Sequence, residues 1–117
     1  MKDDLTLKEL GNFSGTQQYF RLSPFFKDAV GTDGIRYIMT NGYSWLVSDA
    51  LAVIHMKIRD QPFIVVKLTL KEDRKGTVTY TDGNKKVLAK QHYEYTDAKK
   101  EVKMYFTNGV LMLPSEY

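Results

Sequence analysis

The longest helical pattern in the chain runs over residues 44–58. Its apolar residues recur with the 3.6-residue period of one helix face, which consists of Leu46, Ala50, Val53, Ile54 and Ile58. Trp45 and Leu51 widen this face, the Ser44 hydroxyl can cap the first turn, and Pro62 stops the helix. Because no other pattern of this length occurs, the sequence predicts one long helix lying over a sheet formed by the residues that follow.

After Pro62 the apolar period changes from 3.6 to 2, which is typical of strands. The alternation predicts five strands, over residues 63–71, 77–82, 86–96, 102–106 and 110–113. Asp82-Gly83-Asn84 and Asn108-Gly109 are strong hairpin signals between them. Consecutive strands joined by tight turns form an antiparallel meander with one apolar face toward the long helix.

Shorter elements are predicted before the long helix. Thr6–Glu9 matches a capping box and predicts a helix of about two turns. Phe13–Arg21, with its aromatic residues flanked by polar ones, suits a short strand or an extended segment. Thr32 is expected to cap a second short helix over Ile35–Met39, and Gly42 is expected to end it in the left-handed conformation.

The chain of 117 residues is therefore expected to form a single α+β domain over 1–117. N-terminal helices in residues 1–60 pack on one face of a five-stranded antiparallel β-meander in residues 63–114. Hydrophobic residues make up 43% of the chain and charged residues 26%, as in average globular proteins. The apolar runs fall far short of the roughly 20 residues of a membrane span, and the first residues lack a signal peptide, so no membrane contact and a cytoplasmic location are expected.

Positive charge is concentrated in the strand region. Residues 57–103 hold 12 of the 17 basic residues but only 7 of the 14 acidic ones. The candidate binding residues lie on the polar face of the predicted sheet and are Lys67, Lys71, Lys90, His92, Lys103 and Tyr105. Lysines beside aromatic rings are typical of sheets that bind nucleic acid. Threonines outnumber aromatic residues on this face, so a merely solvated face is the competing interpretation.

No strong pattern for catalysis or metal binding occurs in the sequence. The chain has no cysteine and two histidines, too few for a zinc site, so no metal and no cofactor are expected. His92 and Glu94 on one strand face leave a small hydrolase as a minor alternative. Gly31–Gly34 could hold an anion at a helix N-terminus, but the charge of Asp33 opposes this. Asp49, near the apolar helix face, is expected to be a structural hydrogen-bond acceptor.

Six segments together resemble a known family. They are Phe13–Arg21, Thr32–Tyr37, Tyr43–Ala50, Gln61–Leu68, Tyr93–Asp97 and Asn108–Tyr117. The chain is similar to a family of small uncharacterised bacterial domains that are common on plasmids and phages, and the LxLPSEY-type ending is the most specific part of the resemblance. The resemblance implies no activity, but it implies a mobile-element context, in which small proteins often bind host machinery.

The expected function is therefore that of a non-catalytic binding or inhibitor protein of mobile-element origin, which acts by contact with a host protein. Expected contact surfaces are the aromatic residues of Phe13–Phe26 and the open edge of the last strand, Val110–Leu113. The alternative is nucleic-acid or nucleotide binding on the basic sheet face. An enzyme is not expected.

Overall fold

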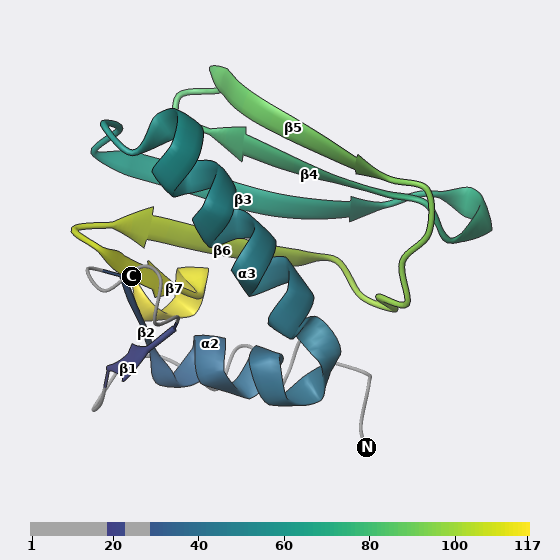
Figure 1. Cartoon of the computed structure of the whole chain (residues 1–117), viewed down its shortest axis with the longest axis horizontal. Helices are drawn as coiled ribbons and strands as arrows, with labels where there is room; N and C mark the ends of the chain where they lie inside the picture. Colours follow the sequence, from purple (N-terminus) through teal and green to yellow (C-terminus); the bar gives the residue numbers. More distant parts are fainter. Residues whose placement is uncertain (1–18, 23–28) are drawn as a thin grey trace.

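The protein has an α+β fold, as the sequence predicted. The computed structural model describes residues 19–22 and 29–117, in which helices lie against a seven-stranded sheet (Figure 1). The strands are β1 (Phe20–Arg21), β2 (Val30–Gly31), β3 (Phe63–Leu70), β4 (Gly76–Thr81), β5 (Val87–Tyr93), β6 (Val102–Thr107) and β7 (Val110–Met112). Their order across the sheet is β1-β2-β7-β6-β3-β4-β5, and all neighbours are antiparallel except the parallel pair of β2 and β7.

The helical part is almost continuous. Helix α2 (Asp33–Ile38) leads through the turn η1 (Met39–Tyr43) into α3 (Ser44–Val53), which η2 (Ile54–Ile58) extends. Gly42 has a φ of 98° and marks the corner between the two helices, as predicted. The predicted capping role of Ser44 is wrong: its hydroxyl donates to the Met39 carbonyl oxygen at 3.0 Å. Ser44 has helical backbone angles (φ −59°, ψ −37°) and is the first residue of α3, so the N-cap position belongs to Tyr43 and not to Ser44.

The hydrophobic core fills the space between α3 and the sheet. The predicted apolar face of the long helix is buried along its whole length, and Val47, which the pattern did not include, is buried too. The fully buried residues of β3, β4 and β6 occupy the alternating apolar positions and are Ile64, Val66, Leu68, Val78, Tyr80 and Met104. Leu111 of β7 is also fully buried. The period of the apolar residues thus predicted correctly the core-facing side of α3, β3, β4 and β6.

The predicted five-stranded meander is wrong in strand number and in order. Strand β6 pairs with β3 instead of β5, so the chain leaves β5 at Tyr93 and runs around the end of the sheet before β6 begins (Figure 1). Two contacts hold this connection in place: the Thr96 amide donates to the Arg74 carbonyl at 2.7 Å, and the Tyr43 hydroxyl donates to the Lys100 carbonyl at 3.0 Å. Residues 97–100, predicted as a tight turn, belong to this longer crossing.

The ends of the sheet also differ from the prediction. Strand β7 does not present an open edge, because β2 pairs with it in parallel, so the edges of the described sheet are β1 and β5. The third predicted strand is shorter than expected, and a register shift beside Tyr80 turns Val87 outward, where it is 52% exposed. The predicted helix at Thr6–Glu9, and most of Phe13–Phe26, lie outside the described residues.

The end of the chain fastens α2 to the sheet. Glu116, in the turn η4 (Pro114–Glu116), places its carboxylate at the start of α2. The Thr32 hydroxyl donates to this carboxylate at 2.6 Å, and the Gly34 amide donates to it at 3.0 Å. A Cβ at Gly34 would overlap the ends of the Glu116 and Leu113 side chains, so a larger residue here would require both side chains to shift. Thr32 also caps α2 as predicted, and the anion at the helix N-terminus is the chain's own glutamate.

Among the helices described, not one has the length and hydrophobicity that crossing a bilayer would require.

Candidate functional site

On two surfaces of the protein, charged or aromatic side chains from separate segments lie close together. The first is the lysine face, defined as Lys67, Lys85, Lys90 and Lys103, on the side of the sheet that faces away from α3. Lys90, Lys67 and Lys103 lie in one row across β5, β4, β3 and β6, with Thr79 between the first two. Neighbouring strands are about 4.8 Å apart, so the row extends over roughly 14 Å.

The structure places the other predicted binding residues around this row. Tyr105 pairs with Val65, one step along the same face, whereas His92 pairs with Thr77 on the opposite side of the row. Lys71 follows the end of β3 and lies outside the row. The alternation of the strands therefore brought three of the four predicted lysines and Tyr105 together. Lys85 was not among the predicted residues, because it lies in the loop after β4, where no period exists.

A shallow hollow of about 370 Å³ lies in the lysine face. The residues that line it include Lys67, Lys85 and Lys103, together with Val65. Beside it lies the aromatic cluster, defined as Phe63, Tyr105 and Tyr117, whose ring centres are 5.1–5.5 Å apart. The Lys103 ammonium lies 5.7 Å from the centre of the Tyr105 ring, which is cation–π distance. Tyr117 was not among the predicted binding residues, because it follows the last strand; it belongs to the ending that carries the family resemblance.

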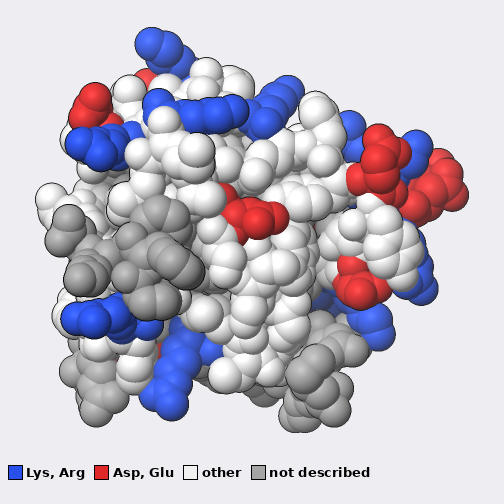
Figure 2. Space-filling model, viewed as in Figure 1, with Lys and Arg blue, Asp and Glu red and all other residues white. Residues whose placement is uncertain are grey.

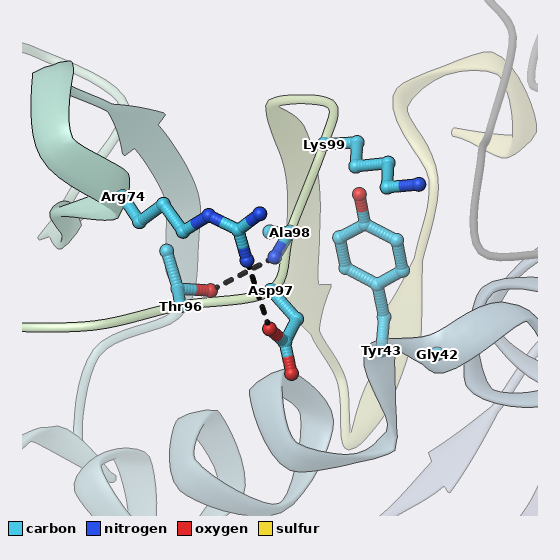
Figure 3. A pocket seen from close by; sticks show the side chains of 7 residues that line it. All are labelled: Gly42, Tyr43, Arg74, Thr96, Asp97, Ala98 and Lys99. Atoms are coloured by element: carbon cyan, nitrogen blue, oxygen red, sulfur yellow. Dashed lines mark hydrogen bonds and ion pairs between the residues drawn. The ribbon is translucent and has the colours of Figure 1, made fainter.

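The second surface is the tyrosine groove, defined by its lining residues Tyr43, Trp45, Arg74, Tyr93, Tyr95 and Asp97. It consists of two adjoining hollows of about 580 and 220 Å³, which share Gly42, Thr96 and Asp97. Figure 3 shows the hollow of about 580 Å³. The groove lies between the start of α3 and the connection from β5 to β6, on the helix side of the sheet. On this side, charged groups lie mainly toward the edges of the molecule, and the centre is uncharged apart from an acidic group (Figure 2).

The inner wall of the groove is fixed by ring contacts and hydrogen bonds. Trp45 meets Tyr93 edge to face with ring centres 5.3 Å apart, and it stacks on Tyr43 at 6.5 Å. The Tyr93 hydroxyl donates to the Asp49 carboxylate at 2.6 Å. Asp49 is thus the structural hydrogen-bond acceptor that the sequence predicted. The hydrogen bond engages one oxygen of the Asp49 carboxylate and helps to hold the Tyr93 ring in place.

Burial and the nearby Asp49 carboxylate both raise the pKa of two tyrosines, Tyr93 and Tyr80. Burial raises the pKa of the Tyr93 hydroxyl far above its usual value of 10, and the hydrogen bond to Asp49 raises it further. Burial, together with the charge of Asp49, also raises the pKa of Tyr80, whose hydroxyl donates to the Gln91 side chain at 2.7 Å. Both hydroxyls are therefore neutral hydrogen-bond donors near pH 7.

The outer wall of the groove depends on an unusual backbone. In the turn η3 (Glu72–Arg74), Asp73 and Arg74 both have a φ of 59°, in the left-handed region. This conformation costs about 1–2 kcal/mol for a residue with a side chain. It directs Arg74 toward the groove, where its guanidinium donates to the Tyr95 hydroxyl at 2.9 Å and lies 3.7 Å from the Asp97 carboxylate (Figure 3). Backbone strain of this kind concentrates at functional sites.

The residues considered for catalysis do not form a cluster. His92 Nδ1 lies 3.3 Å from the Thr77 hydroxyl, and His55 Nδ1 lies 3.0 Å from the Leu51 carbonyl oxygen. Across residues 19–22 and 29–117, no three side chains of the kinds that bind metals lie close enough to share an ion. For the hydrolase alternative, based on His92 and Glu94, the described part of the structure adds no further catalytic residue beside this pair.

The tyrosine groove was not predicted from the sequence. Its residues come from three separate segments, and no period connects them. One signal was available: Tyr43–Ala50 and Tyr93–Asp97 are two of the six segments that carry the family resemblance, and they meet in the groove. Arg74, from a turn between two strands, carried no signal of its own.

Comparison with known families gives one match. The model of DUF6876, described as a family of unknown function, matches residues 4–117. The comparisons with curated proteins and with solved structures gave no significant match.

Proposed function

We propose that this chain, which belongs to the DUF6876 family of unknown function, is a non-catalytic binding or inhibitor protein that acts by contact with another protein. In this proposal the tyrosine groove holds a segment of the partner. The observation that carries it is that four aromatic side chains line the two adjoining hollows of the groove: Tyr43 lines one together with Arg74, and Trp45, Tyr93 and Tyr95 line the other.

The composition of the groove supports contact with a protein. Tyrosine, tryptophan and arginine are the residues most enriched among those that dominate the energy of protein interfaces. Aromatic side chains have few rotatable bonds, so they lose little conformational entropy on binding. Here the rings are already held by contacts within the chain, which lowers the cost of ordering them further. A mixed apolar and polar segment suits such a lining.

The origin and place of action form part of the proposal. The resemblance to a family common on plasmids and phages supports a mobile-element origin, and we infer that the partner is a protein of the bacterial host. Contact with host machinery would then take place in the cytoplasm.

Site-specific photocrosslinking tests the groove as the contact surface. A photoreactive phenylalanine analogue replaces Tyr95, which is 62% exposed in the groove, or Tyr19, which is 60% exposed directly before β1, at the other edge of the sheet. The two positions are matched in residue type and exposure. In host cells, position 95 is expected to give one dominant crosslinked protein, identified by mass spectrometry, that position 19 does not give.

A second variant distinguishes a specific contact from random capture. Arg74→Ala removes the guanidinium at the rim of the groove without touching the buried rings. It is expected to reduce the crosslink from position 95 while thermal unfolding stays close to that of the unchanged protein. Equal crosslinking from positions 95 and 19, or a crosslink that Arg74→Ala leaves unchanged, would contradict the groove as the contact surface.

A further inference from the structure

The lysine face places positive charges together without acidic partners. Lys67 and Lys103 are direct cross-strand partners, an arrangement that is destabilising for like charges. The one ion pair within the described part of the chain joins Arg74 to Asp97, in the tyrosine groove, so no carboxylate there offsets the lysine row. The hollow beside the row is lined by three lysines and by no acidic residue. An anionic ligand would remove the repulsion that the fold leaves in place.

The aromatic cluster next to this row adds a second kind of recognition. Tyr117 is 75% exposed, and its ring meets those of Phe63 and Tyr105 nearly at right angles. A flat ring in solvent beside positive charge is the arrangement on which unpaired bases stack. Gly83 keeps the loop after β4 close to Phe63, since a Cβ there would lie only 3.3 Å from the ring, and this loop carries Lys85 into the hollow.

We propose that the lysine face and the aromatic cluster together bind single-stranded nucleic acid. Phosphates lie along the row of Lys90, Lys67 and Lys103 and at Lys85, and a base stacks on Tyr117. Both groups occupy the same side of the sheet, so one short strand can reach them together. A double helix cannot offer its bases to the ring, because they are already paired and stacked. This site lies on the opposite side of the sheet from the tyrosine groove and does not depend on the proposed function.

Fluorescence anisotropy with short labelled oligothymidylate and oligouridylate across a series of salt concentrations tests the proposal. Each phosphate contact on a single strand lowers log K by about 0.7 for each unit of log salt, so four lysines predict a slope near 2.8. The double variant Lys67→Gln/Lys103→Gln is expected to reduce the slope by about 1.4. The matched control Lys57→Gln/Lys75→Gln removes the same charge from exposed lysines outside the row and is expected to keep the slope.

A second variant separates stacking from charge. Tyr117→Ala is expected to weaken binding roughly tenfold while the slope stays that of the unchanged protein, since stacking releases no counterions. The exposed Tyr19→Ala serves as its control. The comparison of thymidylate with uridylate decides between DNA and RNA as the preferred ligand.

Three results would overturn the proposal. The first is the absence of salt-dependent binding. The second is an equal reduction of the salt slope in Lys67→Gln/Lys103→Gln and in Lys57→Gln/Lys75→Gln, which would mean that any surface lysine can contact the phosphates. The third is equally tight binding of a duplex of the same length, which would leave the ring without a role. Crosslinking from position 95 is expected to be unaffected by Lys67→Gln/Lys103→Gln, so a failure here is distinguishable from a failure of the proposed function.

Discussion

The tyrosine groove and the lysine face use the two sides of one sheet in opposite ways. In the groove, the polar groups are bonded to one another: Tyr93 to Asp49, and Arg74 to Tyr95 and Asp97. On the lysine face, Lys67 and Lys103 oppose each other with no acid between them. The contacts in the groove therefore help to stabilise the fold, whereas the repulsion between Lys67 and Lys103 opposes it. Substitutions should separate the two surfaces by their effect on stability before any ligand is added.

The largest difference is expected at Trp45. Trp45→Ala removes a partly buried ring that contacts Tyr43 and Tyr93 and is expected to lower the free energy of unfolding by about 3 kcal/mol. Lys67→Ala, on the other side of the sheet, is expected to change it by no more than about 0.5 kcal/mol. Denaturant unfolding measures both. A midpoint for Trp45→Ala equal to that of Lys67→Ala would mean that the groove does not support the fold.

A smaller effect is expected from a single hydroxyl in the groove. Tyr93→Phe leaves the Asp49 carboxylate without the donor at 2.6 Å and is expected to destabilise the protein by about 1–2 kcal/mol. The control Tyr95→Phe removes a hydroxyl whose only described donor is the exposed Arg74, and it is expected to cost less than about 0.5 kcal/mol. If the two variants unfold at the same denaturant concentration, the bond to Asp49 contributes nothing beyond an exposed contact.

High pH is expected to act on the groove through the same hydroxyl. The folded protein raises the pKa of Tyr93 above the value of 10 that it has when unfolded, so the stabilisation is complete below pH 10 and declines as the pH rises further. Denaturant midpoints measured at pH 8 and at steps above pH 10 are expected to fall, and to fall less steeply in Tyr93→Phe. Parallel curves for the two proteins would show that this hydroxyl is not responsible.

The smallest effect is expected on the lysine face, and it has the opposite sign. Lys67→Gln removes the repulsion from Lys103 and is expected to raise the free energy of unfolding by about 0.2–0.5 kcal/mol. Lys67→Gln/Lys103→Gln is expected to add little to this, because either change alone removes the pair. Added salt should stabilise the unchanged protein more than the variant, since it screens the same repulsion. A loss of stability in Lys67→Gln would mean that this lysine has a structural role.

The sequence was most informative where a period exists. The faces of α3 and β3 followed from the positions of residues such as Leu46, Ala50 and Val66, because burial of one side is a local property of each element. The order of the strands did not follow, because the period says which face a residue takes and nothing about which strand lies beside it. Strand β1 lies within Phe13–Arg21, which was predicted as a short strand or an extended segment, whereas β2 has two residues, too few for a periodic pattern.

The two surfaces differ in how much of them could be predicted from the sequence. Lys67, Lys90 and Lys103 share a face because they occupy alternate positions in regular strands. The groove instead depends on the crossing from β5 to β6 and on the left-handed backbone at Arg74, which are consequences of tertiary structure. The alternation over residues 86–96 predicted Tyr95 as part of a strand, and this is wrong, since β5 ends at Tyr93.

The fastening of α2 by Glu116 has a consequence for how the chain folds. Thr32 and Glu116 are 84 positions apart, and β2 finds its neighbour only in β7, so the first and last parts of the described chain complete each other. Contacts of such long range close large loops and slow the folding of a domain. During synthesis the segment around α2 precedes its partners, so Thr32, Gly34 and β2 can make these contacts only once residues 110–116 have been added. The interval before the last strand is in place is therefore the time at which this protein is most prone to aggregate.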